Sequence, residues 1–558
     1  MLKTIQLLST LIFLVVALLF SSCNDSVKPG AANDVATSIP SDASGVLLMN
    51  VKTMMEKADY QAFQKTEVFA DFLKDVEKEN PALVPFVKDP AAAGIDLTGN
   101  MGMYFKAAPK FEESEFAILM PVADAVKAKA AIAEMLKEEQ DITTTDKEGY
   151  TLYTLEDKAY LVQSDKIVAF TTFGDDVKVK ALVAPEGKGI RDNEKFAKQI
   201  PTGKDMVYWL DIDPLVEAVF TDSKTKLRVE GAMASANIPV EGLKNNSLYG
   251  FNDFQKGKST GEMAFQFSDE LKAELGELVT DKMAVNYANY LPEGNLGAAF
   301  SFGVNGKGVL NFLTKRGLDQ QIDAQLGMLG LSLGAVEEGI TGDLAAGLYP
   351  PAEGTSEPSV VLALGLKDKA FMEGLMSRAP LSMFMPKDGE NYVFSRGQDM
   401  MGNEMPKYYA RIVNDALIVS NNMALFDQAL AGNSNKNIQP LQEGWLGMYL
   451  DYTVITDNFD VIARALPMNP MVLSQLSQNM KYQNITTAYL VGKGEKLEFH
   501  SNNKDQSMNA LKSSLMTWNQ MYKDGVLDTP DMEEDLEDEM DAFEEAFEEA
   551  AEEEAKEL

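Results

Sequence analysis

Two stretches of similar sequence, "LTGNMGMYF" (residues 97–105) and "ITGDLAAGLY" (residues 340–349), decide how this chain is organised. A strand-like segment and then a helical stretch follow each of them, "EFAILMPVAD" in the first case and "SVVLALGLKD" in the second. Three further pairs of stretches recur in the same order at offsets of roughly 240 to 250 residues. Their positions are 39–51 with 291–304, 163–172 with 413–422, and 207–212 with 447–452. The pattern predicts a tandem duplication with its boundary near residue 285.

Each half mixes two kinds of periodicity. Short apolar runs such as "GVLLMNV" and "MVYWLDI" indicate strands, and their pairing across short polar breaks favours antiparallel hairpins. Helical patterns fall between them, for example "DAVKAKAAIAEMLKEE" with Asp124 as its N-cap. The predicted fold class is α+β, as two tandem related repeats with mainly antiparallel sheets and packed helices. The repeats span residues 39–285 and 286–525.

The second repeat closes with an amphipathic pattern that is typical of a packed helix. Its apolar side chains recur three or four residues apart, at Met508, Leu511, Leu515, Trp518 and Tyr522. Such a stripe is more often part of a core than a binding surface. We therefore expect this segment to pack inside the protein.

The N-terminal residues are typical of an export signal. Lys3 precedes an apolar run, residues 5–20, which is shorter than the ~20 residues that a spanning helix needs. Cys23, the only cysteine, follows this run, and an exported protein with a spare thiol would risk stray disulfides. We expect a signal peptide at residues 1–22 and a polar tether at residues 23–38.

The sequence around Cys23 resembles the lipobox of bacterial lipoproteins. Small residues, Ser21 and Ser22, stand before the cysteine, although Phe20 occupies a position where leucine is commonest. The resemblance implies cleavage before Cys23 and a diacylglycerol on its sulfur, so that lipid chains anchor the protein. Asn24 stands where an aspartate would imply retention at the inner membrane. The outer membrane is therefore expected, with the body facing either the periplasm or the exterior.

The charge of the chain is strongly acidic and unevenly distributed. Its net charge is −35, and residues 531–558 carry 16 acids and one lysine, which is −15. The body, at −20, is unsuited to nucleic acid. The acidic tail (526–558) is either disordered or an amphipathic helix, because apolar residues recur within it at helical spacing. These residues are Met532, Leu536, Met540, Phe543, Phe547 and Ala550.

A catalytic site is not expected, but one motif suggests a hydrolase. "GLSLG" (330–334) fits the nucleophile-elbow string, and the single histidine, His500, follows Ser332 in the order of an α/β-hydrolase. An elbow requires a buried strand before the serine, whereas the preceding residues favour helix or turn. Ser332 and His500 are therefore weak catalytic candidates.

Metal ligands are equally sparse. Asp211 and Asp213 form a DxD string after a predicted strand and could hold a cation through carboxylate oxygens. An aspartate that caps the following segment is the simpler interpretation. With one histidine and one cysteine, a zinc or copper site is almost excluded, while calcium remains open. No cofactor is expected.

The lipobox, the opening "IPSDASGVLLMN", the "LTGN" and "ITGD" stretches and the two-half layout together resemble an uncharacterised family of Gram-negative bacterial lipoproteins, classed as a domain of unknown function. The resemblance implies export and anchoring and assigns no catalytic residue. We expect a non-enzymatic binding or structural protein of the cell envelope, attached to the membrane by lipid on Cys23. Its partner is an envelope protein, a peptide or a glycan. The alternatives are a hydrolase and a periplasmic chaperone or assembly factor, for which the 30 methionines would give adaptable surfaces.

Overall fold

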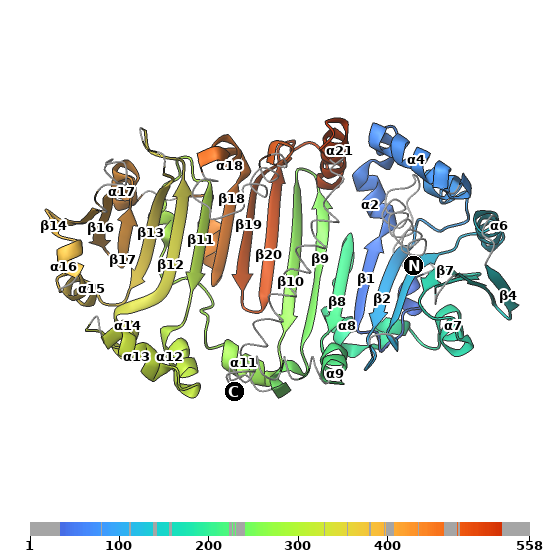
Figure 1. Ribbon diagram of the computed structural model, residues 1–558, viewed down its shortest axis with the longest axis horizontal. Coiled ribbons are helices and arrows are strands. Elements are labelled where there is room, and N and C mark those ends of the chain that lie inside the picture. The colour runs from blue at the N-terminus through green and yellow to red at the C-terminus, as the bar shows by residue number, and fades with distance from the viewer. Residues whose placement is uncertain are drawn as a thin grey trace, which may run out of the picture.

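The structure is a computed structural model that describes residues 34–526. The exceptions within this range are residues 80, 111–112, 138–141, 156–158, 222–225, 227–228, 230–239, 328–329, 354, 356, 379–380, 396, 398–406, 433–434, 462–476 and 478–479. Cys23 and the acidic tail therefore lie outside the described residues. The predicted α+β class is confirmed, because helices accompany one large antiparallel sheet (Figure 1).

The strands of the first half are five to nine residues long. They are β1 (Gly45–Asn50), β2 (Asn100–Lys106), β3 (Glu115–Pro121), β4 (Thr143–Lys147), β5 (Tyr150–Thr154), β6 (Tyr160–Ser164), β7 (Ile167–Thr171), β8 (Met206–Asp211), β9 (Ser247–Gln255) and β10 (Lys258–Gln266). The strands of the second half are β11 (Ala298–Gly303), β12 (Ile340–Tyr349), β13 (Ser359–Leu366), β14 (Lys387–Asp388), β15 (Asn391–Ser395), β16 (Lys407–Val413), β17 (Ala416–Ser420), β18 (Leu446–Asp451), β19 (Ile485–Lys493) and β20 (Lys496–Asn503).

Many of the helices begin at Asn, Asp or Ser caps, whose side chains accept from the first free backbone amides. In the first half they are α2 (Val51–Ala58), α3 (Tyr60–Phe63), α4 (Glu67–Glu79), α5 (Val84–Lys88), α6 (Ala125–Met135), α7 (Asp176–Val183), α8 (Glu194–Gln199), α9 (Asp213–Thr221) and α11 (Asp269–Leu275). In the second half they are α12 (Gly306–Lys315), α13 (Asp319–Gly327), α14 (Leu333–Gly339), α15 (Lys369–Met376), α16 (Leu381–Phe384), α17 (Met423–Ala431), α18 (Tyr452–Asp457) and α21 (Ala510–Lys523). Short 3₁₀ turns are η1 (Val35–Thr37), η2 (Pro81–Leu83), η4 (Gly189–Asp192), η5 (Val240–Leu243), η6 (Tyr287–Asn289) and η7 (Gln439–Glu443).

The strand order of the first half recurs, reversed in space, in the second. Across the sheet the first half runs β4-β5-β6-β7-β3-β2-β1-β8-β9-β10. The second half continues β20-β19-β18-β11-β12-β13-β17-β16-β15-β14. The halves join where β10 pairs with β20 and Gly261 lies opposite Phe499. This correspondence is a fact of the topology, while descent from one ancestral unit stays a prediction.

The halves exchange their C-terminal segments. Helix α21, which ends the second half, packs into the core of the first half through Leu511 and Leu515. The segment after α11 packs on the second half, where Asn305 N donates to Leu278 O and Val279 forms an isolated bridge with Val304. Each half therefore completes the other, and packing crosses the boundary near residue 285.

The two halves differ in which faces of the sheet are covered by a core. In the first half one core fills each face of the sheet, beneath α2–α5 on one side and around α7 and α8 on the other. In the second half the larger core lies on the face that carries Tyr449, Val361 and Ile418. A small core beside α15 covers the far end of the opposite face. The middle of that opposite face belongs to no core cluster among the described residues.

Candidate functional site

An apolar surface that no core among the described residues covers runs across the middle of the sheet, and we call it the open face. Strand register places its side chains on one side of nine adjacent strands, from β8 to β13 (Figure 1). Four of them are exposed: Phe300 (39%), Leu344 (40%), Met448 (42%) and Phe499 (37%). The others are half-buried, namely Tyr208, Leu210, Leu248, Met263, Phe265, Phe302, Leu348, Leu362, Leu446, Leu450, Leu490 and Leu497.

The open face exists because the two halves differ in the helices that follow their first strands. In the first half Met49 lies in a core formed with α2–α5 and α21, and Leu47 packs against that core. The matching residues of β11 are Phe302 and Phe300, since both pairs occupy the same register in their sheets. Helices α12 and α14 bury only a glycine each and α13 buries nothing, so they leave this face accessible.

The chemistry of the open face is that of a hydrocarbon surface. Its strands lie within the sheet, so their backbone groups are already paired with neighbours on both sides. Most of the polar side chains nearest to it are satisfied internally, because Ser259 and Ser501 bond each other at 2.7 Å and the Tyr208 hydroxyl donates to Glu262 O. The exposed Asn252, opposite Gly261, is a polar side chain on the face itself. The surface can therefore desolvate an apolar partner but offers few hydrogen bonds to a polar one.

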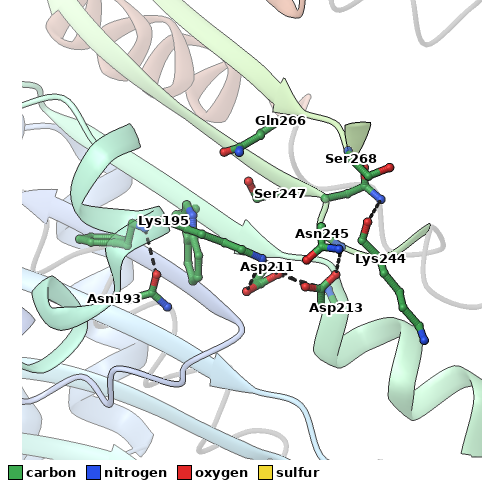
Figure 2. A network of polar contacts seen from close by, with 12 residues as sticks. Asn193, Lys195, Asp211, Asp213, Lys244, Asn245, Ser247, Gln266 and Ser268 are labelled. Carbon is green, nitrogen blue, oxygen red and sulfur yellow. Dashed lines mark hydrogen bonds and ion pairs between the residues drawn. The ribbon is translucent and has the colours of Figure 1, made fainter. Parts of the chain in front are cut away.

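The two predicted metal ligands meet a lysine (Figure 2). Lys195 Nζ lies 3.2 Å from Asp211 Oδ1 and 3.2 Å from Asp213 Oδ2. Asp211 Oδ1 also accepts from the Asp213 amide, and Asp213 Oδ1 accepts from the Asn245 amide. The ammonium group thus occupies the position where a cation bridging the carboxylates would sit.

The electrostatics of this cluster favour the ion pair. Burial lowers the pKa of Lys195, but the charges and hydrogen bonds of Asp211 and Asp213 outweigh it, so the pKa lies above its ordinary value. The described residues contain no group of three or more His, Cys, Asp or Glu that could hold a metal. The contacts of Asp211 and Asp213 are those of a helix start rather than of an ion site.

The structure does not bring Ser332 and His500 together. Ser332 is the N-cap of α14, and its hydroxyl accepts from the Ala335 amide at 3.2 Å. His500 lies on β20, stacked on Tyr489 with ring centroids 4.5 Å apart. Helix α14 leads into β12, which is four strands from β20, or about 19 Å at ~4.8 Å per strand. Burial lowers the pKa of His500, which favours the neutral ring.

A second concave surface lies on the first half. A groove of about 890 Å³ runs between the residues after η1 and helix α7, with Pro40 and Val177 among its lining residues. Charges of both signs, including Asp42, Asp165 and Lys180, also line it.

The open face was not predicted from the sequence, although the apolar pattern of its strands indicates it. Strands β11, β12 and β18 carry apolar residues on both faces, which is the pattern of a strand covered on both sides. The sparse apolar content of α13, "DQQIDAQLG", indicates that its helix cannot supply that cover. Comparing the two observations would have predicted an uncovered surface.

No helix in the described part of the chain is long and apolar enough to cross a membrane.

Comparisons with known proteins give a family but no activity. No curated protein matches the chain. Crystal form I of TP0453 is similar at 10% identity and a TM-score of 0.25, covering 45% of this chain and 90% of that one. Crystal form IV of the same protein gives 13% identity and a TM-score of 0.24, covering 42% of this chain and 81% of that one. Residues 36–425 match a domain of unknown function designated DUF4836. That match covers most of the chain, which therefore belongs to the DUF4836 family.

Proposed function

We propose that this protein is a lipid-anchored component of the bacterial cell envelope that binds an apolar ligand on its open face. The observation that carries the proposal is the extent of the open face, which spans nine strands and belongs to no core. Soluble proteins rarely leave so continuous an apolar surface without a partner. The anchor would be the lipid on Cys23.

The ligand class that suits this surface is a long hydrocarbon chain. An extended peptide laid on it would leave backbone amides and carbonyls without partners, and a glycan would bury hydroxyl groups, at about 1 to 3 kcal/mol for each unpaired group. A hydrocarbon chain bears no such cost and gains about 0.8 kcal/mol for each buried methylene. Phe300, Met448 and Phe499 supply contacts that adapt to such a chain.

The binding proposal is tested with a fluorescent long-chain fatty acid titrated into the protein. We expect saturable binding that weakens about tenfold or more in Met448→Asp and Phe499→Asp, since each substitution places a carboxylate on the open face. Thr260→Asp is the matched control, because Thr260 pairs with His500 on the other side of the sheet. Equal binding by all three variants would contradict the proposal.

The anchoring proposal has its own test. Cys23→Ala removes the thiol that lipid addition needs, so the protein should move from the membrane fraction to the soluble one and lose labelling by a fatty-acid analogue. Ser22→Thr is a control that retains the thiol. Continued labelling of Cys23→Ala would remove the anchor from the proposal without affecting the open face.

One observation favours a second candidate function, a chaperone or assembly factor. Met263 and Met448 lie on the open face among leucines and phenylalanines, and methionine side chains adapt to varied apolar partners. Such a protein would suppress aggregation of an unfolded client, and Phe499→Asp would reduce that activity. The hydrolase alternative gains no comparable support, because Ser332 and His500 lie on separate elements.

A further inference from the structure

The open face needs a cover whenever no ligand occupies it, and the chain continues beyond the described residues. Residues 527–558 follow the last described residue, Val526. Their sequence combines an apolar stripe with 17 acids. Neither the fold nor the proposed binding function accounts for that stripe, since a tail that only improves solubility has no use for it.

The described chain ends on the same side of the sheet as the open face. Helix α21 packs into the core that contains Met49, and Leu47 packs against the same core. Leu47 lies opposite Tyr208 of the open face in the β1–β8 register, so α21 and the open face share one side. Figure 1 shows α21 above the central strands.

The end of α21 also lies beside the second half. The Tyr482 hydroxyl donates to Asp524 Oδ2 at 2.8 Å, and Tyr482 comes three residues before the start of β19. Leu490 of β19 belongs to the open face and lies opposite Met448. The tail therefore starts next to β18 and β20, which carry two of the four exposed residues of the open face, Met448 and Phe499.

The tail is long enough to cross the second half's part of the open face. The stripe from Met532 to Ala550 would extend about 28 Å as a helix at 1.5 Å per residue. The distance from β19 to β13 is four strand spacings, or about 19 Å. Residues 527–531 can bridge up to about 17 Å when extended, so the stripe reaches every strand of the second half's open face.

We infer that the acidic tail lies across the open face as an amphipathic segment and covers it through its apolar stripe. The uncharged surface accepts only that stripe, while the carboxylates point to solvent. Because residues 531–558 carry −15 and the rest of the chain −20, mutual repulsion opposes docking. Docking should therefore strengthen at high salt or low pH and weaken at low salt. This inference depends on the open face and not on the class of its external ligand.

Disulfide cross-linking within the full chain tests the inference. Cys23→Ser is introduced first, so that the engineered cysteines are the only thiols. Phe543→Cys is then combined with Phe300→Cys on the open face or, as the control, with Thr260→Cys on the other side. Under mild oxidation we expect about fivefold or more intramolecular product with Phe300→Cys than with the control, and more at high salt. Met448→Cys provides a second open-face position if Phe300→Cys fails to fold.

A second measurement uses the fluorescent fatty acid on the full chain. Phe543→Ser with Phe547→Ser removes both aromatic side chains of the stripe, so that binding should strengthen about threefold or more once the cover is lost. Glu544→Gln with Glu548→Gln is the matched control, because it leaves the stripe intact and should not strengthen binding. Equal cross-linking on both sides of the sheet would overturn the inference. Cross-linking on the open face without fatty-acid binding would support the inferred position of the tail and contradict the proposed ligand class.

Discussion

Asp211 and Asp451 occupy the same place in the two halves of the sheet. The Asp211 amide donates to Ser44 O at 2.7 Å, and the Asp451 amide donates to Gly297 O at 2.7 Å, just before the first strand of each half. Each side chain then accepts from the amide two residues later. The halves differ in the next acid, because Asp213 of the first half is matched by Thr453, and only the first half places a lysine there.

That difference predicts how the protein responds to calcium. Lys195 already bridges Asp211 and Asp213, so millimolar calcium should change the melting temperature by less than about 1 °C in thermal scans with and without a chelator. Removing the ammonium with Lys195→Met should lower stability by about 1 kcal/mol or less, since the group is partly exposed. A calcium-dependent rise that Asp213→Asn abolishes would contradict the lysine interpretation.

The environment of Asp343 predicts that removing its charge will increase the stability of the protein. It is fully buried, its Oδ2 accepts from the Ala284 and Val285 amides at 2.6 and 3.1 Å, and its Oδ1 has no hydrogen-bond partner. Burial raises its pKa above the ordinary 3.8. The folded state therefore holds a proton that the unfolded chain releases, and stability is lost as pH rises from 3.8 through the raised pKa.

Asp343→Asn should accordingly stabilise the protein by about 1 kcal/mol at neutral pH and flatten this pH dependence. The first half supports the choice, because Asn100 takes the matching place opposite Asn50, as Asp343 does opposite Gly303. Urea unfolding at pH 5 and pH 8 measures both effects. Asp146→Asn, on an exposed carboxylate, is the control, and a loss of stability at pH 8 in Asp343→Asn would refute the assignment.

A largely buried ion cluster around Lys57 predicts the opposite, that removing a charge will decrease the stability of the protein. Lys57 Nζ lies 2.7 Å from both Asp205 and Asp253, and Asp205 is only 2% exposed. Burial opposes these charges, but the hydrogen bonds outweigh it, so the pKa of Lys57 is raised and that of Asp253 is lowered. The lysine's contribution is fully present below its ordinary 10.5 and is lost as pH rises through the raised value. The Asp253 contribution is present above 3.8 and is lost as pH falls through the lowered value.

Lys57→Met leaves Asp205 without its cation and Asp253 with only the more distant Lys204 at 3.8 Å, so the free energy of unfolding at pH 7 should fall by about 3 kcal/mol. The variant should also recover part of this loss near pH 4, where the carboxylates take up protons. Urea unfolding across pH 4 to 8 gives the measurement, with Lys129→Met, whose ion pair is exposed, as the control. Similar small losses in both variants would show that the cluster contributes little.

The sequence predicts the strands and their order better than it predicts the surface. The stretches "LTGN" and "ITGD" recur because they lead into equivalent strands. Asn100 at the start of β2 and Asp343 in β12 occupy the same register position opposite β1 and β11. The alternation of apolar residues likewise identifies the strands themselves. These features are local in the sequence, so they can be recognised without knowing which elements meet in space.

The open face and the exchange of α21 could not be predicted in the same way. Both depend on which elements meet in space. The stripe containing Leu511 and Leu515 correctly predicts a packed helix but does not say that its partner is the first half. Similarly, chain order alone does not show how far apart Ser332 and His500 lie. The sheet topology shows it, because β12, the strand that follows α14, is four strands from β20.

The exchange of α21 leads to the last prediction, that the two halves unfold as one unit. Leu515 is 7% exposed and lies in the first half's core, where Trp518 of the same helix stacks on Phe63 with ring centroids 6.2 Å apart. Leu515→Ala should therefore lower the free energy of unfolding by about 2 to 4 kcal/mol and keep a single transition. The mutation lies in the second half, so independent halves would instead give two transitions, of which only the second half's would shift. Ser514→Ala, one residue away and exposed, should cost less than about 1 kcal/mol. Fluorescence of Trp209 and Trp445, one in each half, should report the same midpoint in each variant if the interlocked packing holds the molecule together.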